Sequence, residues 1–516
     1  MQSFIENERA CGILAHISSL PGPYGIGDIG SSSFKFIDFL SHAGQKYWQI
    51  LPTVPTSLYF DSSPYMSTSA FADSPLLISP DSLHEMDLLD EKTLLNYPQF
   101  SPYSTDYPRV YKYKRQLLEL CFKSFSANND RHDSRYQSFI SRTPWLNDYA
   151  LFMCLKEVYE NKPWSAWPDK LARRDPSALA EAEDRYRQQA DYYLFEQYLF
   201  YKQWSALKQY ARSKDIKLIG DIPIYVGLDS SDVWANQSIF EIDEKTLKPI
   251  RVSGVPPDYF SKTGQLWGNP LYRWNSKNTE TESALLDWWL LRFKSVFAMV
   301  DIVRVDHFRG FETYWAVPAD EETALNGEWI KGPGAQFFNK IYTQLGELNI
   351  IAEDLGEITP EVIKLRDNLG FPGMKVLQFA FDNTPENYFL PYNYKTSNCV
   401  VYTGTHDNDT SMGWFLSDQL SNEDRKRIKQ FANRVMNDPS PINNDLIYLA
   451  LSSIAALAII PLQDVLGFGS DCRMNTPGVA EGNWRWRCHE KYLTSELADD
   501  FKRVVTRFGR ILNNSS

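Results

Sequence analysis

Three apolar segments of the sequence end in acidic residues. Asp306 ends the segment IVRVD, Glu353 follows the apolar residues of NIIAED, and Asp407 lies in TGTHDND directly after CVVY. Segments rich in valine and isoleucine favour strands that are buried on both faces. One acidic residue at such a place is most often a helix cap or a salt-bridge partner, but three in equivalent places indicate a shared chemical role.

The surroundings of the first two carboxylates suggest opposite charge states. Alternation along a strand places Arg304 and Asp306 on one face, and the guanidinium would keep the carboxylate ionised, which suits a nucleophile. The apolar residues before Glu353 would raise its pKa, which suits a general acid. Such a pair, about 5–5.5 Å apart, cleaves a glycosidic bond with retention of configuration. A third carboxylate, here Asp407, can stabilise the transition state.

Short apolar segments recur along the chain and would position these residues. Eight candidate strands can be identified: CGILAH, YWQILP, IKLIGDIPIYV, MVDIVRVDH, NIIAEDLG, MKVLQFAF, CVVYTGTHDND and AIIPLQDVLG. Helical stretches lie between several of them, including residues 283–297, 334–348 and the segment TPEVIKLRDNLG, in which Thr359 would cap the helix and Gly370 would end it. Eight strands alternating with helices predict an α/β fold, the (β/α)8 TIM barrel, whose catalytic groups lie at the carboxyl ends of the strands.

Two connections are much longer than the βα loops of about 2–6 residues that barrels normally use. We therefore expect a single catalytic barrel over residues 1–516 that carries two inserted subdomains. Residues 53–215, between strands 2 and 3, should form a mainly helical subdomain, and residues 227–281, between strands 3 and 4, an ordered lid loop over the active site. The apolar run 446–462 contains Pro461 and precedes Gln463 and Asp464, so it favours a buried helix followed by a buried strand over a membrane span.

Composition argues against several classes of protein. Lys and Arg number 53 against 65 Asp and Glu, a net charge of -12, and no basic block suggests a nucleic-acid partner. The six cysteines are scattered and the seven histidines form no HExxH pair, so we expect no metal site and a reducing compartment. The first residues, MQSFIENERACG, lack the apolar stretch of a signal peptide. We expect a cytoplasmic protein without a cofactor, and its 15 Trp and 29 Tyr would suit stacking on sugar rings.

The chain resembles the amylomaltases, or disproportionating enzymes, which are 4-α-glucanotransferases related to the α-amylase superfamily. The resemblance rests on an ordered set of motifs over nearly the whole chain: SSLPGPYGIGDIG, AGQKYWQILP, SPYMSTSAFA, GDIPIYV, PPDYFSKTGQLWGNPLY, VRVDHFRGFETYWAVPA, IAEDLG, GTHDNDTSMGWF, QDVLGFGSDCRMNTPG and GNWRWR. It implies Asp306 as nucleophile, Glu353 as general acid/base and Asp407 as transition-state stabiliser. These are the three residues that the strand ends indicate.

The same resemblance implies a set of substrate-binding residues. Arg304, His307 and His406 match residues around the reacting sugar, Tyr65, Asp221 and Asn475 match further contacts, and Asp258, Gln265 and Trp267 match a loop that arches over the site. The chain departs from the family at Met66, where relatives commonly carry Gln, and at Asp73–Ser74, where Gly–Asn is usual. Met66 removes one possible hydrogen bond to sugar.

The implied activity is the transfer of α-1,4-glucan segments between maltooligosaccharides by a retaining double displacement. The same carboxylates could run hydrolysis with water as the acceptor, so an α-1,4-glucan hydrolase is the main alternative. A non-catalytic glucan-binding barrel is a remote one, because all three carboxylates are present. The residues alone do not separate transfer from hydrolysis, and the preference for transfer rests on the resemblance.

Overall fold

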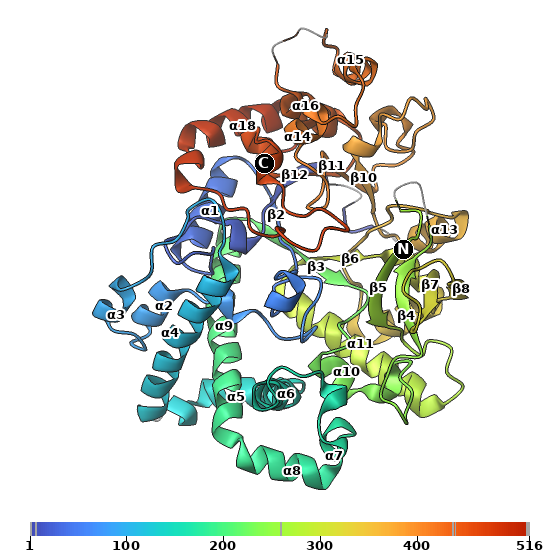
Figure 1. Cartoon of the computed structure of the whole chain (residues 1–516). Helices are drawn as coiled ribbons and strands as arrows, with labels where there is room; N and C mark the ends of the chain where they lie inside the picture. The colour runs from blue at the N-terminus through green and yellow to red at the C-terminus, as the bar shows by residue number, and fades with distance from the viewer. Residues whose placement is uncertain are drawn as a thin grey trace.

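Eight parallel strands close into a barrel at the centre of the molecule (Figure 1). The computed structural model describes residues 3–5, 8–128, 130–257, 261–435, 438 and 440–511. The barrel strands, in chain order, are β1 (Ala10–Leu14), β2 (Tyr47–Gln49), β3 (Lys217–Pro223), β6 (Ile302–Asp306), β9 (Ile350–Ala352), β10 (Gly373–Val376), β11 (Cys399–Tyr402) and β12 (Leu457–Pro461). Each of the eight apolar segments supplies one strand, so the predicted (β/α)8 barrel is confirmed.

The strands are short and nearly all of their residues are buried, because helices cover the outer face of the barrel. These helices include α1 (Ser31–His42), α9 (Arg187–Ser213), α11 (Thr279–Met299), α12 (Gly334–Leu345), α13 (Pro360–Asn368), α16 (Ile442–Ser452) and α18 (Ser495–Arg507). Three of them fall where helices were predicted. Thr359 holds the N-cap position of α13 but its side chain makes no capping hydrogen bond, and Gly370 takes the left-handed conformation shortly after the helix ends.

The apolar run 446–462 divides as the sequence predicts. It contains most of helix α16 and the buried strand β12, and the short helix α17 (Leu462–Leu466) follows. Within the described part of the chain, no helix is both long enough and apolar enough to cross a membrane. The connection from β11 to α16 also carries α14 (Ser411–Leu416) and α15 (Asn422–Phe431).

Helices dominate the chain between β2 and β3 and lie beside the barrel (Figure 1). They are α2 (Pro80–Glu85), α3 (Glu91–Leu95), α4 (Tyr107–Ala127), α5 (Ser134–Arg142), α6 (Leu146–Val158), α7 (Asp169–Ala172), α8 (Pro176–Arg185) and α9. The Lys156 ammonium of α6 lies 2.6 Å from the Asp229 carboxylate, which follows β3. Because the Lys156 side chain is almost fully buried, this pair fixes the helices to the carboxyl end of the barrel.

A second, antiparallel sheet lies beside the barrel mouth and was not predicted. Its order is β5 (Gln265–Pro270), β4 (Arg251–Val255), β7 (Thr313–Pro318) and β8 (Glu328–Lys331). The segment expected as a lid loop therefore contains two strands besides the short helix α10 (Ser231–Ala235). Glycine and proline in these segments lower their strand propensity, and β4 is a strand because it pairs with β5 on one side and β7 on the other.

Candidate active site

The carboxyl ends of β6, β9 and β11 bring the three predicted carboxylates to the same end of the barrel. Asp306 is the last residue of β6, Glu353 directly follows β9, and Asp407 lies in the turn after β11. All three residues are partly exposed, whereas most of the strand residues before them are buried. The side chains can therefore reach a ligand from a rigid, buried support.

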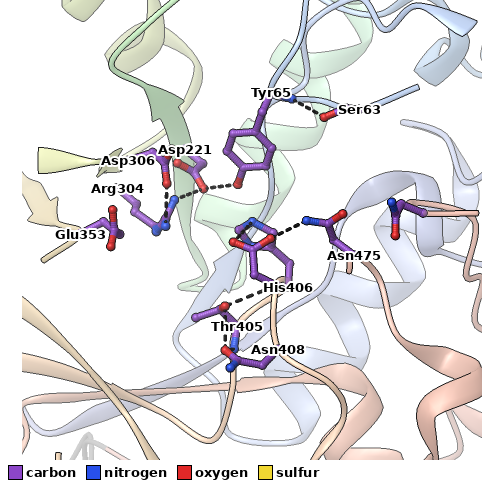
Figure 2. Close-up of polar contacts among 12 residues, drawn as sticks. Ser63, Tyr65, Asp221, Arg304, Asp306, Glu353, Thr405, His406, Asn408 and Asn475 are labelled. Carbon is purple, nitrogen blue, oxygen red and sulfur yellow. Dashed lines mark hydrogen bonds and ion pairs between the residues drawn. The ribbon is translucent and has the colours of Figure 1, made fainter. Parts of the chain in front are cut away.

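Arg304 joins two carboxylates at the β3–β6 edge (Figure 2). The register of these parallel strands pairs Asp221 with Arg304. One guanidinium nitrogen, Nη1, lies 2.7 Å from Asp221 Oδ2, and the other, Nη2, lies 2.8 Å from Asp306 Oδ1. The Arg304 side chain is only 4% exposed, so water screens this interaction little. The fixed positive charge stabilises the ionised carboxylate of Asp306.

Asp221 lies behind the surface of the site rather than on it. Its side chain is fully covered, and its Oδ2 accepts hydrogen bonds from Arg304 Nη1 and from the Tyr65 hydroxyl at 2.8 Å. Burial raises the pKa of Asp221 to about 6, although the Arg304 guanidinium opposes that rise. Asp221, predicted as a substrate contact, is thus placed where it orients Arg304 and Tyr65.

Among the described residues, Glu353 has no such guanidinium partner. Its Oε2 accepts the backbone N–H of His307 at 2.7 Å, and its Oε1 accepts the backbone N–H of Leu355 at 2.8 Å. Burial and then the negative charge of Asp306 raise the pKa of Glu353 to about 8, against the opposing effects of Arg304 and the two backbone donors. Glu353 is therefore protonated at neutral pH, as a general acid must be.

The left-handed backbone of His307 belongs to this arrangement. Its φ of 52° is uncommon for a residue other than glycine, and its N–H points at Glu353. Burial and then the charge of Arg309 lower the pKa of the His307 imidazole to about 3, so the ring is neutral. The Trp267 indole packs edge-on against that ring with centroids 4.8 Å apart.

The neighbouring carboxylate, Asp354, faces the opposite side of the strand end. It is 2% exposed, forms an ion pair with Arg366 of α13 and accepts the backbone N–H of Met374 at 2.7 Å. A Cβ atom at Gly373 would lie 2.5 Å from Asp354 Oδ2, so only glycine leaves room for this contact. Successive residues on an extended chain point to opposite faces, and this assigns Glu353 to the site and Asp354 to the barrel wall.

A short turn and a second loop hold Asp407. The Asn408 side-chain oxygen accepts the N–H and the hydroxyl of Thr405 at 2.9 and 3.0 Å, which closes the turn. Asn475 Nδ2 donates to Asp407 Oδ1 at 2.6 Å, and His406 Nε2 lies 3.4 Å from Asp407 Oδ2. The Tyr65 ring stacks on the His406 ring, with centroids 5.2 Å apart. Tyr65 thereby connects Asp407 to the Asp221–Arg304–Asp306 group.

Two of the three residues predicted to arch over the site, Gln265 and Trp267, lie on β5. Trp267 Nε1 donates to Gln265 Oε1 at 3.2 Å, and both residues are at least partly exposed. Asp258, the third predicted residue, lies outside the described residues. The buried side chain of Asn269 donates to Val226 O at 2.9 Å and approaches Met66 Sδ at 3.7 Å, so β5 is fixed to the segment that carries Tyr65.

The two departures from the family pattern occupy different places. Met66 is partly exposed beside Tyr65, and its sulfur accepts from Asn269. Asp73 lies farther along the same loop, where its Oδ1 accepts the Thr53 hydroxyl at 2.5 Å, and burial raises its pKa to about 7. Met66 is thus near the sugar-facing residues, whereas Asp73 supports the end of β2.

Sequence reasoning did not single out Arg473, which contacts the backbone of Asp407 and of Asn475. The motif that contains it, DCRMNTPG, is apparent in the sequence, but nothing in the pattern says which residue Arg473 contacts. Among the described residues, no group of three or more His, Cys, Asp or Glu side chains could hold a metal ion.

Comparisons with known proteins agree with this geometry. The sequence profile of a family described as 4-alpha-glucanotransferase matches residues 15–494. The chain is 48% identical over 507 residues to the 4-alpha-glucanotransferase of Synechocystis sp., with 98% of each chain covered. It is 41% identical to the chloroplastic/amyloplastic 4-alpha-glucanotransferase of Solanum tuberosum, over 98% of this chain and 87% of the relative.

A solved structure extends the likeness to the whole fold. The amylomaltase from Streptococcus agalactiae in complex with acarbose superposes with a TM-score of 0.92 at 38% sequence identity, over 98% of this chain and all of that one. The matched profile spans the three strand-end carboxylates and the residues that hold them. The chain belongs to the 4-alpha-glucanotransferase family.

Proposed function

We propose that this protein transfers α-1,4-glucan segments between maltooligosaccharides by a retaining double displacement. Family membership supports the activity and its substrates. The observation that supports the mechanism is the pairing of two unlike carboxyl groups: Asp306 beside the Arg304 guanidinium, and Glu353 with its pKa raised to about 8. One group is ready to attack and the other to give up a proton.

In the first step, Glu353 protonates the oxygen of an α-1,4 bond while an Asp306 oxygen attacks C1. The C1–O bond breaks, a bond between C1 and Asp306 forms, and the shortened glucan leaves with a free 4-hydroxyl. Arg304 limits the movement of Asp306 during attack, because the guanidinium is itself fixed by Asp221. Loss of the proton leaves Glu353 as a carboxylate, ready for the second step.

In the second step, the 4-hydroxyl of another glucan attacks C1 from the side that the first product has left. Glu353 takes the hydroxyl proton, the new C1–O bond forms, and Asp306 is released. Asp407, oriented by Asn475, is positioned to bind sugar hydroxyls and to favour the positively charged, distorted transition state. Both carboxyl groups then return to their starting states.

Residues 227–281 supply the lid in this proposal. Strand β5 presents Trp267 beside His307, Gln265 accepts a hydrogen bond from Trp267, and Asn269 holds the strand against the Tyr65 segment. An indole at this place would exclude water from the glucosyl intermediate and provide a surface for the acceptor sugar. Transfer is then favoured over hydrolysis, which is the alternative that uses the same carboxylates.

We also place this activity in the cytoplasm. All six cysteines are free, and free cysteines suit a reducing compartment. Glycogen fragments and maltodextrins are the substrates that this location offers.

Incubation with maltotriose tests the proposed function. A transferase yields glucose together with a ladder of maltooligosaccharides longer than maltotriose, because each donor segment is passed to another sugar. A hydrolase yields only shorter sugars, and a glucan-binding protein yields no new product. The Asp306→Asn variant is the control, since it keeps the size of the side chain and removes the nucleophile. A ladder formed equally well by that variant would refute the assignment.

A further inference from the structure

Arg473 connects two loops of the site although it does not itself belong to the sugar-facing residues. It follows a short helical turn, 470–472, in the connection after α17. Its Nη2 donates to the backbone oxygen of Asp407 at 2.7 Å, and its Nε donates to the backbone oxygen of Asn475 at 2.7 Å. One guanidinium thus binds the backbone of Asp407, the residue predicted to stabilise the transition state, and the backbone of Asn475, whose side-chain amide orients the Asp407 carboxylate.

The geometry of these two hydrogen bonds suits arginine and no other side chain. Nε and one terminal nitrogen lie on the same edge of a rigid planar group, so the two donors have a fixed separation and direction. Two backbone oxygens that accept from this edge are held at a fixed distance from each other. Lysine carries the same charge but places its donors on a single nitrogen, and it cannot span both oxygens in this way.

The loops that Arg473 joins also contact each other directly. Asn475 donates from its side chain to Asp407 Oδ1 at 2.6 Å and from its backbone N–H to His406 O at 3.1 Å. The contact between the Asn475 amide and the Asp407 carboxylate therefore depends on the relative position of two backbone segments, and Arg473 fixes both. A shift of one segment by a fraction of an ångström would turn the carboxylate away from the sugar.

Arg473 lines a small pocket beside the turn after β11. Residues from four barrel connections line it, including His16, Leu51, His406 and Gln463 as well as Arg473. A small planar cation could enter this space if the arginine side chain were removed. The pocket thus makes it feasible to test what the guanidinium does by supplying it from solution.

We propose that Arg473 is a positioning residue for the transfer reaction: it binds the backbone oxygens of Asp407 and Asn475 with one guanidinium edge and so fixes the Asp407 carboxylate against the sugar in the transition state. This inference rests on the proposed role of Asp407. Arg473 acts only through the two loops, and it needs no contact with donor or acceptor.

The Arg473→Ala variant should show a loss in kcat with little change in KM. A misplacement of about 1 Å at a catalytic group costs roughly 10²-fold in rate, and we expect a decrease in kcat of that order. KM should stay within about threefold, because the residues that bind the ground state are retained. Arg473→Lys should recover only a small part of the lost rate, since it restores the charge without the second donor.

Arg425 provides a matched control elsewhere in the chain. Its Nε and Nη2 donate to the backbone oxygens of Phe415 and Ser417, each at 2.7 Å, at the junction of α14 and α15. Arg425→Ala removes the same pair of arginine–carbonyl hydrogen bonds outside the site. It should lower the melting temperature about as much as Arg473→Ala does and leave kcat unchanged.

Chemical rescue separates positioning from a general loss of structure. Guanidinium chloride at about 10–50 mM, far below the molar concentrations that unfold proteins, is added to each variant. We expect guanidinium to restore kcat of Arg473→Ala by about tenfold or more, as it replaces the missing hydrogen bonds in place. Guanidinium should not change kcat of the Arg425→Ala and Asp407→Asn variants.

The outcomes distinguish this inference from the proposed function. If Asp407→Asn loses activity while Arg473→Ala keeps the wild-type kcat, or loses it without any rescue, the inference is wrong and the proposed function stands. If Asp407→Asn keeps full activity, the proposed role of Asp407 fails first. Three results together support the inference: Arg473→Ala lowers kcat, guanidinium restores it, and Arg425→Ala leaves kcat unchanged.

Discussion

Two sides of the barrel mouth present carboxyl groups in opposite electrostatic settings. At the β3–β6 edge, the buried Arg304 lies within 2.8 Å of both Asp221 and Asp306, and its positive charge opposes the rise in the pKa of Asp221 that burial causes. At the end of β9, Glu353 accepts two backbone N–H groups and forms no ion pair with any residue that the structure describes, and burial together with the charge of Asp306 raises its pKa to about 8. The direct ion pair with Arg304 distinguishes Asp306, the proposed nucleophile, from Glu353, the proposed proton donor.

Glu353 and Asp354 repeat this comparison within two consecutive residues. Asp354 pairs with the buried Arg366 and accepts a backbone N–H inside the barrel wall, where no sugar can reach it. Glu353 is partly exposed and has no ion pair among the described residues. An ion pair with arginine therefore occurs both at the buried Asp354 and at Asp306, the proposed nucleophile, so exposure has to be considered as well.

The largest effect should follow from removing the proton donor. Glu353→Gln keeps one of the two backbone hydrogen bonds through its single amide oxygen but cannot protonate the leaving oxygen, and we expect kcat on maltooligosaccharides to fall by about 10³–10⁴-fold. Rates are measured by glucose release from maltotriose. Asp354→Asn, the matched change next to it, should lower the melting temperature and spare most of kcat; equal losses of kcat in both variants would contradict the assignment.

Replacing the arginine that distinguishes the two sides should have the next largest effect. Arg304→Lys can hold Asp221 or Asp306 but not both with the same geometry, and we expect a loss in kcat on the order of 10²-fold. Arg366→Lys is the matched change in the barrel wall and should cost thermal stability with kcat largely kept. Steady-state kinetics and thermal unfolding on both variants test this; an active Arg304→Lys with wild-type kcat would count against the role of Arg304.

The pH dependence of kcat/KM should have a high-pH limb set by Glu353. Its raised pKa means that the acid form is present below about pH 8 and is lost as the pH rises, so kcat/KM should fall about tenfold per unit above that value. An α-maltosyl fluoride donor needs no protonation of its leaving group, and with it the limb should weaken or disappear. A limb that begins below pH 6 with maltooligosaccharides would show that Glu353 is already ionised at neutral pH.

The smallest effect should concern the choice of acceptor. Trp267→Leu removes the indole beside His307, and we expect the ratio of transfer to hydrolysis to fall by roughly 3–10-fold while the total rate changes less. Product ladders from maltotriose, compared with the release of reducing ends, give this ratio. Trp329→Leu alters another tryptophan of the same sheet, on β8, and should leave the ratio as in the wild type.

The barrel can be predicted from the sequence because each of its strands is a short apolar segment that is buried on both faces. The same reasoning fails for β4 and β5, where Gly254, Gly268 and Pro270 interrupt the pattern, and for β7 and β8, which are partly exposed. These segments become strands through their pairing across the insertions, and no local pattern contains that information.

The three carboxylates could be predicted from the sequence because they lie at the ends of strands. The residues that hold them in place could not be predicted. The hydrogen bond from Arg473 to the Asp407 backbone joins residues 66 positions apart and ends on a carbonyl group, which every residue has. The placement of Asp221 behind Arg304 likewise follows from the register of β3 against β6. Contacts of this kind depend on three-dimensional arrangement alone, so residue type and spacing do not predict them.

The most direct test of the account is to trap the sugar on the enzyme. In Glu353→Gln, an α-maltosyl fluoride can still react with the nucleophile because fluoride leaves without a proton, whereas the second step lacks its base, so the covalent intermediate should accumulate. Peptide mapping by mass spectrometry should then place one maltosyl group on Asp306. An adduct on a different residue, or no adduct while the fluoride is consumed, would contradict the assignment of Asp306 and Glu353.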